Sequence, residues 1–382
     1  MNFDLTDEQQ MLQAAAREFL ASRLSSEKIR SLASSDDGFD ATLWREMADL
    51  NWPGLLVSER YGGQALGMVE LAVLMEQLGY ALAPGPVFSD TLAALALEAA
   101  ASGEQRERYL APLAAGEKRG TLALWDAGAA TDPDRIELEP DRSNGGYKLS
   151  GEKLFVLDAA IADFIIVGAS GGRRFIVDRD AAGLTIEPTP TIDGTRKQYA
   201  VKLDAVEVSE DAMFEGAEEL SRARDRAYIA LAAELTGIAQ RALDMAVTYA
   251  KDRKQFGRPI GAYQAVSHAC AQMLLETEGA RSAVYYAAWA AENEPETSPL
   301  AASMAKAYAS DAGCRVTGAS LQVHGGIGFT WEHDLHLWLK RARCDAAYLG
   351  DARWHRERIA SLAIDGAVSS VAGVEPELAA AG

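Results

Sequence analysis

The residue pattern changes twice along this chain of 382 residues, and that change constrains the fold most. Apolar residues recur at helical spacing up to about residue 118 and again from about 216. Between these stretches lie short runs rich in β-branched and aromatic residues, separated by turns. The length also exceeds the ~250–300 residues at which single cores usually divide. We therefore expect an α+β multidomain fold: an N-terminal α-helical domain (1–118), a middle β-barrel-like domain (119–215), a C-terminal four-helix bundle (216–370) and a tail (371–382).

Local signals support these elements. Thr6 to Gln9 form a capping box that opens an apolar helix face. Asn144-Gly145 predicts a hairpin turn, because both residues tolerate positive φ. Long helical runs follow the β-rich region, and their number and length predict a bundle; they span Ala227–Arg253, Tyr263–Asn293 and Leu300–Val323.

Composition excludes several classes of function. The net charge of −19 disfavours nucleic acid as a partner, because phosphate backbones need clustered Lys and Arg. Neither an apolar run of about 18 residues nor a secretory signal is present, so we expect no membrane span and a cytoplasmic protein. The three cysteines and five histidines show no metal-ligand spacing, so no metal site is expected.

Two Gly-punctuated polar clusters stand within the helical sequence, at 253–264 and 322–332. The first offers a permanent cation, two amides and a flat ring, from Arg253, Gln255, Phe256 and Gln264. Such a set suits a dinucleotide: Arg for pyrophosphate, Phe for stacking and Gln for polar edges. The alternative is a charged turn between two helices.

In the second cluster, glycines permit close backbone approach, so the amides after Gln322 can point at a ligand; these glycines are Gly325, Gly326 and Gly328. They could equally form a C-terminal helix stop. Taken alone, each cluster is compatible with a purely structural role.

Together, in this order, the two clusters resemble the acyl-CoA dehydrogenase family, flavoproteins with an α, a β and an α domain. The strings Arg-x-x-Phe-Gly-x-x-Ile-x-x-Tyr-Gln from Arg253 and Gln-x-x-Gly-Gly-x-Gly-Phe-x-x-Glu from Gln322 match the family pattern, and the likeness covers nearly the whole chain. The resemblance implies noncovalent FAD in a homo-oligomer, a dimer or tetramer. Its adenosine diphosphate part would contact both clusters from a neighbouring subunit.

The family reaction is α,β-desaturation of an acyl-CoA thioester. A carboxylate removes the α-proton while hydride passes to the flavin, and base and flavin must lie on opposite faces of the bond. The resemblance therefore implies an acyl-CoA substrate from fatty acid or sterol side-chain metabolism. It also implies an electron-transferring flavoprotein as the acceptor.

The chain departs from the family where that base should lie. The usual Glu of a Tyr-Glu-Gly-Thr string is Leu349 here, and Asp351 replaces the Thr. The position that carries the base in a minority of members aligns with Ala227, so neither site can accept a proton.

One acid remains on the same helix. Glu234 lies two turns after Ala227, on roughly the same face and among apolar neighbours, a setting that would raise the pKa of a carboxyl group towards a useful range. It is the candidate catalytic residue. The alternative is a buried ion pair between Glu234 and an arginine.

The β region departs from the family pattern as well. Where members show Thr-Glu-Pro-Gly-Ala-Gly-Ser-Asp, this chain has 125–132, beginning with Trp125. The flavin-facing Trp-Ile-Thr is Phe155-Val156-Leu157, so stacking on Phe155 is retained while a hydroxyl donor is lost. Phe155 and Trp125 complete the expected cofactor contacts.

Three functions remain open. The first is an active flavin dehydrogenase that uses Glu234 or another carboxylate. The second is a non-catalytic subunit of a heteromer whose related chain supplies the base, as in some members that act on steroid-CoA side chains. The third is a different flavin reaction on the same fold, since fold does not fix chemistry.

Overall fold

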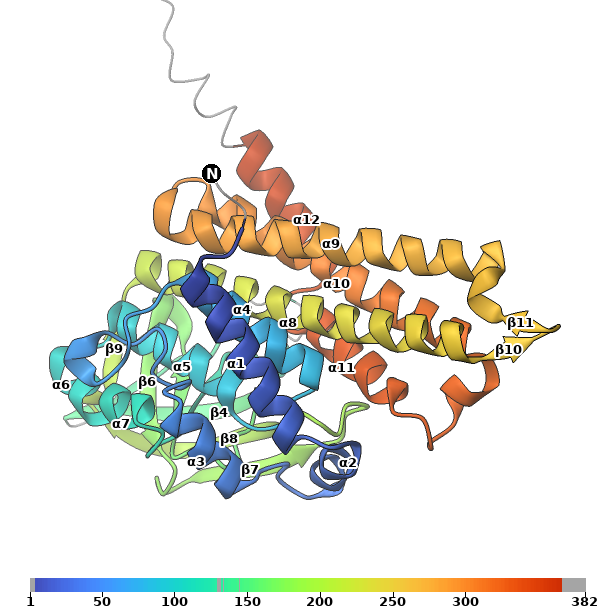
Figure 1. Ribbon diagram of the computed structural model, residues 1–382. Helices are drawn as coiled ribbons and strands as arrows, with labels where there is room; N and C mark the ends of the chain where they lie inside the picture. Colours follow the sequence, from blue (N-terminus) through green and yellow to red (C-terminus); the bar gives the residue numbers. More distant parts are fainter. Residues whose placement is uncertain (1–3, 129–131, 133, 144, 366–382) are drawn as a thin grey trace, which may run out of the picture.

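The computed structural model describes residues 4–128, 132, 134–143 and 145–365. Asn144, three residues of the 125–132 string (129–131) and the expected tail lie outside these. Figure 1 shows N-terminal helices, a β domain and a long C-terminal helical bundle, as the sequence predicts. None of the described helices is long and apolar enough to cross a membrane.

The N-terminal helices pack around two apolar clusters. The predicted capping box begins the first of them: Gln9 N donates to Thr6 Oγ1, and Thr6 N donates to Gln9 Oε1. These helices are α1 (Asp7–Arg23), α2 (Ser26–Ser34), α3 (Ala41–Asp49), α4 (Met68–Ala81), α5 (Val87–Ala100), α6 (Gly103–Gln105) and α7 (Ala111–Ala114).

The β domain consists of two sheets that share one core, rather than a closed barrel. The first sheet has the order β1-β5-β6-β9 and includes a parallel pair, β1 with β5. The second has the order β2-β4-β8-β7, with β3 paired to β4. The strands are β1 (Gly120–Ala123), β2 (Trp125–Asp126), β3 (Asp141–Ser143), β4 (Gly146–Leu157), β5 (Phe164–Gly168), β6 (Arg173–Asp178), β7 (Leu184–Thr189), β8 (Gln198–Ser209) and β9 (Met213–Glu215).

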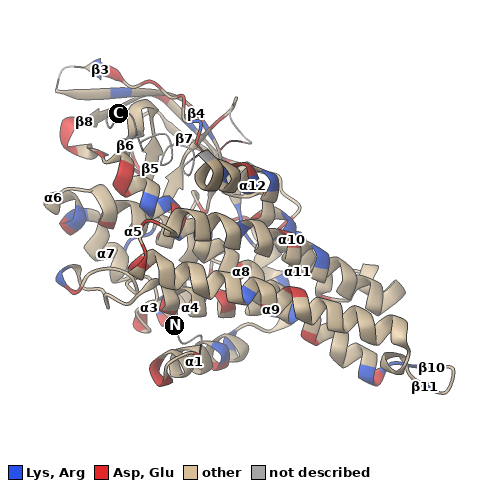
Figure 2. Cartoon of the chain, turned by 90° about the horizontal axis from the view of Figure 1, so that it is seen from above, with Lys and Arg blue, Asp and Glu red and all other residues tan. Residues whose placement is uncertain are grey.

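The C-terminal helices run side by side and carry a small hairpin at one end, as Figures 1 and 2 show. They are α8 (Ala217–Asp252), α9 (Gln264–Asn293), α10 (Ser298–His324), α11 (Leu335–Ala347) and α12 (Ala352–Ala360), with the hairpin strands β10 (Lys254–Gln255) and β11 (Arg258–Pro259). Helix α8 begins well before the expected Ala227, because its charged first turns form pairs such as Arg222 with Glu218 along one face.

Two glycines let α4 and α8 cross in close contact. A Cβ at Gly79 would lie 2.1 Å from the carbonyl oxygen of Glu234, and one at Gly237 would lie 1.9 Å from that of Glu76. Any larger residue would force the helices apart. This crossing fixes the depth of α8 in the core, and α8 carries much of the site described next.

Candidate functional site

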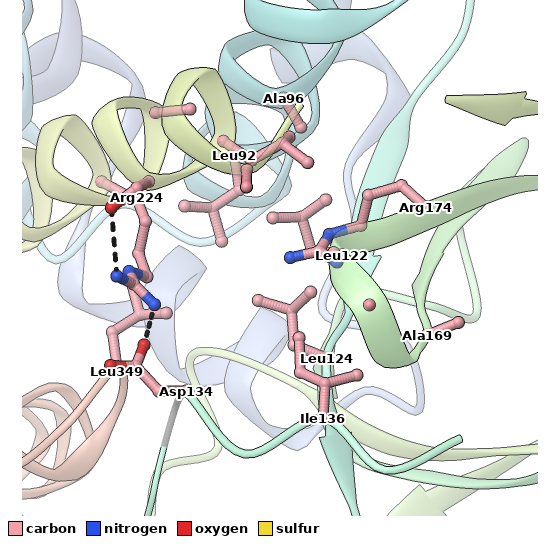
Figure 3. Close-up of a pocket in the computed structure, with 17 residues that line it drawn as sticks. Leu92, Ala96, Leu122, Leu124, Asp134, Ile136, Ala169, Arg174, Arg224 and Leu349 are labelled. Atoms are coloured by element: carbon pink, nitrogen blue, oxygen red, sulfur yellow. Dashed lines mark hydrogen bonds and ion pairs between the residues drawn. The ribbon is translucent and has the colours of Figure 1, made fainter. Parts of the chain in front are cut away.

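A cavity of about 380 Å³ lies between α5, α8 and the first sheet. Figure 3 shows its walls, which are mainly apolar side chains. They come from several elements: Leu92, Ala96, Leu122, Leu124, Asp134, Ile136, Ala169, Gly171, Gly172, Arg174, Ala217, Leu220, Ser221, Ala223, Arg224, Ala227 and Leu349. The fold thus gathers residues from all three parts of the sequence around one space.

Both expected base positions line this cavity. Ala227 comes from α8, and Leu349 follows the end of α11 with a left-handed φ of 59°. The turn around Leu349 is held from two sides. The Lys306 ammonium donates to Ala346 O (3.2 Å) and Gly350 O (3.0 Å), and His355 Nε2 lies 3.1 Å from Leu349 O. The backbone at Leu349 is therefore held in place, but the Leu349 side chain has no carboxylate to act as a base.

Lys306 and His355, which hold the turn around Leu349, are both buried. Burial lowers the pKa of Lys306 to about 7 and that of His355 to about 3. Sequence reasoning did not select either residue. Lys306 is a charge within an apolar helical stretch, whereas His355 lies among charged residues and has no such signal.

Two arginines reach the cavity from different elements. Figure 3 shows Arg174 extending into it from β6, and Arg224 extending from α8 towards Asp134. Arg224 forms an ion pair with Asp134 and donates to Ser221 Oγ at 3.3 Å. Arg174 donates to Arg173 O at 2.9 Å. The only carboxylate among the described lining residues, Asp134, is thus already paired.

Glu234 lies outside the lining of this cavity and is 1% exposed. Arg196 Nη2 contacts its two carboxylate oxygens at 2.8 and 2.7 Å, and Arg341 Nη1 donates to Oε1 at 2.7 Å. Two guanidinium groups therefore engage both oxygens of the candidate base. This arrangement matches the ion-pair alternative left open by the sequence.

The same arginines bind two further acids. Arg341 Nε donates to Asp193 Oδ2 at 2.6 Å, and Arg196 Nη1 donates to Asp345 Oδ1 at 2.7 Å. Burial lowers the pKa of Arg196, but the adjacent Glu234 and Asp345 raise it above its ordinary value overall. We call Asp193, Arg196, Glu234, Arg341 and Asp345 the ionic cluster.

The two Gly-punctuated segments lie at one end of the bundle. The stacked rings of Tyr249 on α8 and His324 on α10, with centroids 4.7 Å apart, join the helix ends that carry them. Arg253, Gln255, Gln264 and Gln322 are exposed, and Phe256 is 93% exposed. No described carboxylate pairs with Arg253. These side chains therefore face outward from this chain.

The glycines of the second segment fit backbone approach by a ligand. Gly325 has a φ of 62°, and nothing lies within 4 Å of a Cβ built on Gly325 or Gly326, whereas Gly328 packs against the preceding helical turn. The segment combines open space next to its amides with a helix end at His324. The structure thus retains both possibilities predicted for it.

Phe155 and Trp125 lie in the β domain, on β4 and β2. Trp125 on β2 pairs with Leu154 on β4, so it is adjacent to Phe155. The Trp125 ring meets the Tyr348 ring edge-on, with centroids 4.6 Å apart.

Asp351 caps α12 by accepting from Trp354 N at 2.8 Å. An acid at this position therefore has a local structural reason.

Comparison with known proteins identifies the fold and the family. The family models described as the acyl-CoA dehydrogenase N-terminal and C-terminal domains match residues 6–117 and 216–363. The acyl-CoA dehydrogenase IpdE2 of Mycolicibacterium smegmatis is 32% identical over 93% of this chain and 98% of its own length. The chain belongs to the acyl-CoA dehydrogenase family.

Solved structures of this family extend the comparison. A variant of the Tcur3481-Tcur3483 steroid ACAD matches with a TM-score of 0.87 and 33% identity, over 95% of this chain and 99% of its own. The ChsE4-ChsE5 complex from Mycobacterium tuberculosis matches with a TM-score of 0.88 and 27% identity, over 95% and 99%. Each of these two structures is described by two protein names. This chain is a flavoenzyme of the same family.

The residues expected to contact FAD lie in two regions of this acyl-CoA dehydrogenase. Arg253 and the open amides near Gly325 provide an exposed anion-binding surface at one end of the bundle. Phe155 on β4 and Trp125 on β2 lie in the β domain, and Figures 1 and 2 both show β4 far from β10. The expected contacts therefore form two separate regions of the chain.

Sequence reasoning missed the cavity arginines. Arg174 stands in a short strand and Arg224 in a charged helical turn, where each resembles an ordinary surface cation. They meet only because β6 and α8 both contribute walls to one cavity. Neither residue had a local sequence signal, because Arg174 follows Arg173 at the start of β6 and Arg224 lies among other charged residues.

Proposed function

We propose that this chain is a subunit of a heteromeric acyl-CoA dehydrogenase in which a related chain supplies the catalytic base. The observation that carries the proposal is the cavity. Ala227 and Leu349, at both base positions, line the same cavity and neither can take a proton. The exposed cofactor surface around Arg253 is meanwhile intact. The chain thus keeps what a partner needs and lacks what its own turnover needs.

The similarity to the Tcur3481-Tcur3483 steroid ACAD and to the ChsE4-ChsE5 complex, each described by two protein names, supports this proposal. FAD, when bound, supplies the hydride acceptor for α,β-dehydrogenation of an acyl-CoA, and electrons then leave to an electron-transferring flavoprotein. Arg253, Gln255, Phe256, Gln264 and Gln322 would hold the adenosine diphosphate part of the partner's FAD. In this chain, the cavity walls would orient a thioester and exclude water.

A homomeric, active dehydrogenase is the second candidate. Asp134 favours it, because this carboxylate lines the cavity. To act as a base, Asp134 would have to leave Arg224, and Glu234 would have to leave both Arg196 and Arg341. We therefore propose that Glu234 holds the domains together rather than removing a proton.

The test is co-expression with related acyl-CoA dehydrogenase chains from the same genome. We expect a stable complex that contains FAD and is bleached anaerobically by an acyl-CoA from a panel of short, branched and steroid side-chain thioesters. The chain alone should bind little FAD and show no bleaching. An FAD-saturated homo-oligomer of this chain that is bleached by any panel member would overturn the proposal.

A matched pair of variants links the cofactor to this chain. Arg253→Gln should lower the FAD content of the complex, because Arg253 would contact the pyrophosphate. Arg258→Gln is the control. Arg258 belongs to the same hairpin but packs over the Tyr263 ring at 4.1 Å, so its loss should leave FAD content unchanged.

A further inference from the structure

The cavity contains a cation with no carboxylate partner. Arg174 lines it from β6, and no described Asp or Glu lies within ion-pair distance of its guanidinium group. Burial lowers the pKa of Arg174 to about 10, with no compensating acid. An unpaired guanidinium in an apolar setting costs free energy unless something else satisfies it.

The neighbouring Arg173 shows what a structural arginine looks like on the same strand. Arg173 donates to Ser170 O at 2.9 Å and to Ser170 Oγ at 3.0 Å, and it pairs with Glu139. It does not line the cavity. Arg174 thus lines the cavity without a carboxylate partner, whereas the adjacent Arg173 lies outside it and is paired.

Arg224 reaches the same space from α8 with part of its hydrogen-bonding capacity unused. Its Nε is buried and has no hydrogen-bond partner among the described residues. Its paired acid, Asp134, is exposed, so solvent screens that ion pair. An incoming anion can therefore share or replace Asp134.

We propose that Arg174 and Arg224 bind an anionic group of the ligand, a phosphate or a carboxylate, from two walls of the cavity. A guanidinium group presents a planar fork of donors that matches either anion. The inference rests on the proposed function and deepens it, because an acyl-CoA can offer such an anion from two sources. One source is the coenzyme A phosphates, and the other is a carboxylate carried by the acyl group.

Ala227 lies only one helical turn from Arg224, so the anion would bind close to one of the two positions that carry the base in other family members. This position is compatible with an acyl carboxylate. The walls formed by α5 would at the same time accept the apolar part of the acyl group. The site would therefore select for ligand charge as well as for shape.

The test is calorimetric binding to the purified complex, using enoyl thioesters that cannot be dehydrogenated again. The probes are crotonyl-CoA, crotonyl-pantetheine and glutaconyl-pantetheine, which separate the coenzyme phosphates from an acyl carboxylate. Arg174→Gln and Arg224→Gln should each weaken binding of the anionic probe about tenfold or more, as expected for loss of a charge-assisted hydrogen bond. Arg173→Gln is the matched control and should bind like the wild type.

The outcomes are distinct. Weakening for crotonyl-CoA alone identifies the phosphates as the anion, and weakening for glutaconyl-pantetheine identifies the acyl carboxylate. Equal affinities of Arg174→Gln and Arg173→Gln for every probe would overturn this inference and leave the proposed function standing. If the folded wild-type complex binds none of the probes, the proposed function fails as well.

Stability provides a second readout that a structural role would not give. Without ligand, Arg174→Met should melt at or above the wild-type temperature, because it removes a partly buried charge that has no carboxylate partner. Saturating crotonyl-CoA or glutaconyl-pantetheine should raise the melting temperature of the wild type more than that of the variant. A lower melting temperature of ligand-free Arg174→Met would show that Arg174 supports the fold and would overturn the proposal.

Discussion

The ionic cluster and the cavity use the same residue type in opposite ways. In the cluster, Arg341 meets Asp193, Glu234 and Thr195 through three different nitrogens, at 2.6 to 2.7 Å. In the cavity, Arg174 meets only a backbone oxygen. Both arginines stand on regular elements and point into the protein. Only the first is satisfied by the chain itself.

This difference separates charges that hold a structure from charges that serve a ligand. The cluster joins a β-domain turn, α8 and α11, whose packing positions Tyr348 and Leu349. Its residues lose little by being rigid. The cavity arginines remain incompletely bonded, which a protein tolerates when binding supplies the missing partner.

Breaking the cluster should produce the largest effect. Glu234→Gln keeps the shape of the side chain but leaves two buried guanidinium groups without their shared carboxylate. We expect the free energy of unfolding to fall by about 3–5 kcal/mol, measured by denaturant titration. The remaining folded protein, assembled in the complex, should keep its rate of flavin bleaching.

The control is Glu219→Gln on the same helix. Glu219 is exposed and pairs only with Arg222, so its loss should change the unfolding free energy by no more than about 0.5 kcal/mol. If Glu234→Gln instead leaves stability unchanged and abolishes bleaching, Glu234 is the base and the structural role is wrong.

A pH-dependent effect is expected beside the cluster, at Asp158. Burial raises the pKa of this carboxyl to about 6 from its ordinary 3.8, although Ser89 donates to it at 2.7 Å. The folded state therefore binds the proton more tightly than the unfolded state, and stability falls as pH rises from about 4 to about 6. Above pH 6 the charged form costs about 3 kcal/mol.

Asp158→Asn should remove that cost. Asn also accepts the left-handed φ of 52° at this position. We expect the variant to be more stable than the wild type at pH 7 to 8 and similar to it near pH 4, in parallel thermal unfolding series. A constant difference at all pH values would mean that the carboxyl does not titrate in this range.

Adding a carboxylate to the cavity tests the comparison between the cavity and the ionic cluster in the opposite way from removing one from the cluster. Leu349→Glu places a carboxylate on a turn already held by Lys306 and His355. A buried acid there should cost about 1–3 kcal/mol of stability. If the chain's own flavin surface is competent, the new base should speed bleaching by about 100-fold or more in a complex whose partner chain has lost its own base.

Leu349→Gln has the same length without a base and is the control for this gain. Equal bleaching by the Glu and Gln variants would show that more than the base is missing from this chain. The replaced flavin-facing residues around Phe155 would then be the next positions to restore.

The fold could be predicted from the sequence because helical and strand periods are local signals. Thr6 and the start of α9 lie where capping and periodicity place them. The start of α8 could not be fixed, because its charged turns carry little apolar signal. The sequence could not predict that the β domain forms two sheets and not a barrel. That outcome depends on which strands pair, and no local pattern indicates strand pairing.

The candidate site was only partly predictable, for the same physical reason. A motif reveals Leu349 and Ala227 as departures, and the structure places both on one cavity. The partners of Glu234 could not be named, because Arg196 and Arg341 are distant in sequence. Pairing between distant side chains depends on tertiary packing, which also brings Arg174 and Arg224 together.

The smallest effect on stability is expected at Phe256. This side chain is almost fully exposed, whereas Glu234 is buried and fully paired. Its ring is 93% exposed and touches only Tyr263 edge-on, with centroids 6.4 Å apart. Phe256→Asn tolerates the positive φ of the hairpin, so the unfolding free energy of the isolated chain should change by no more than about 0.5 kcal/mol. The FAD content of the complex should nevertheless fall, because the exposed ring would stack on the partner's cofactor. An unchanged FAD content, measured by visible absorbance against protein, would remove Phe256 from that surface and leave its exposure without a functional reason.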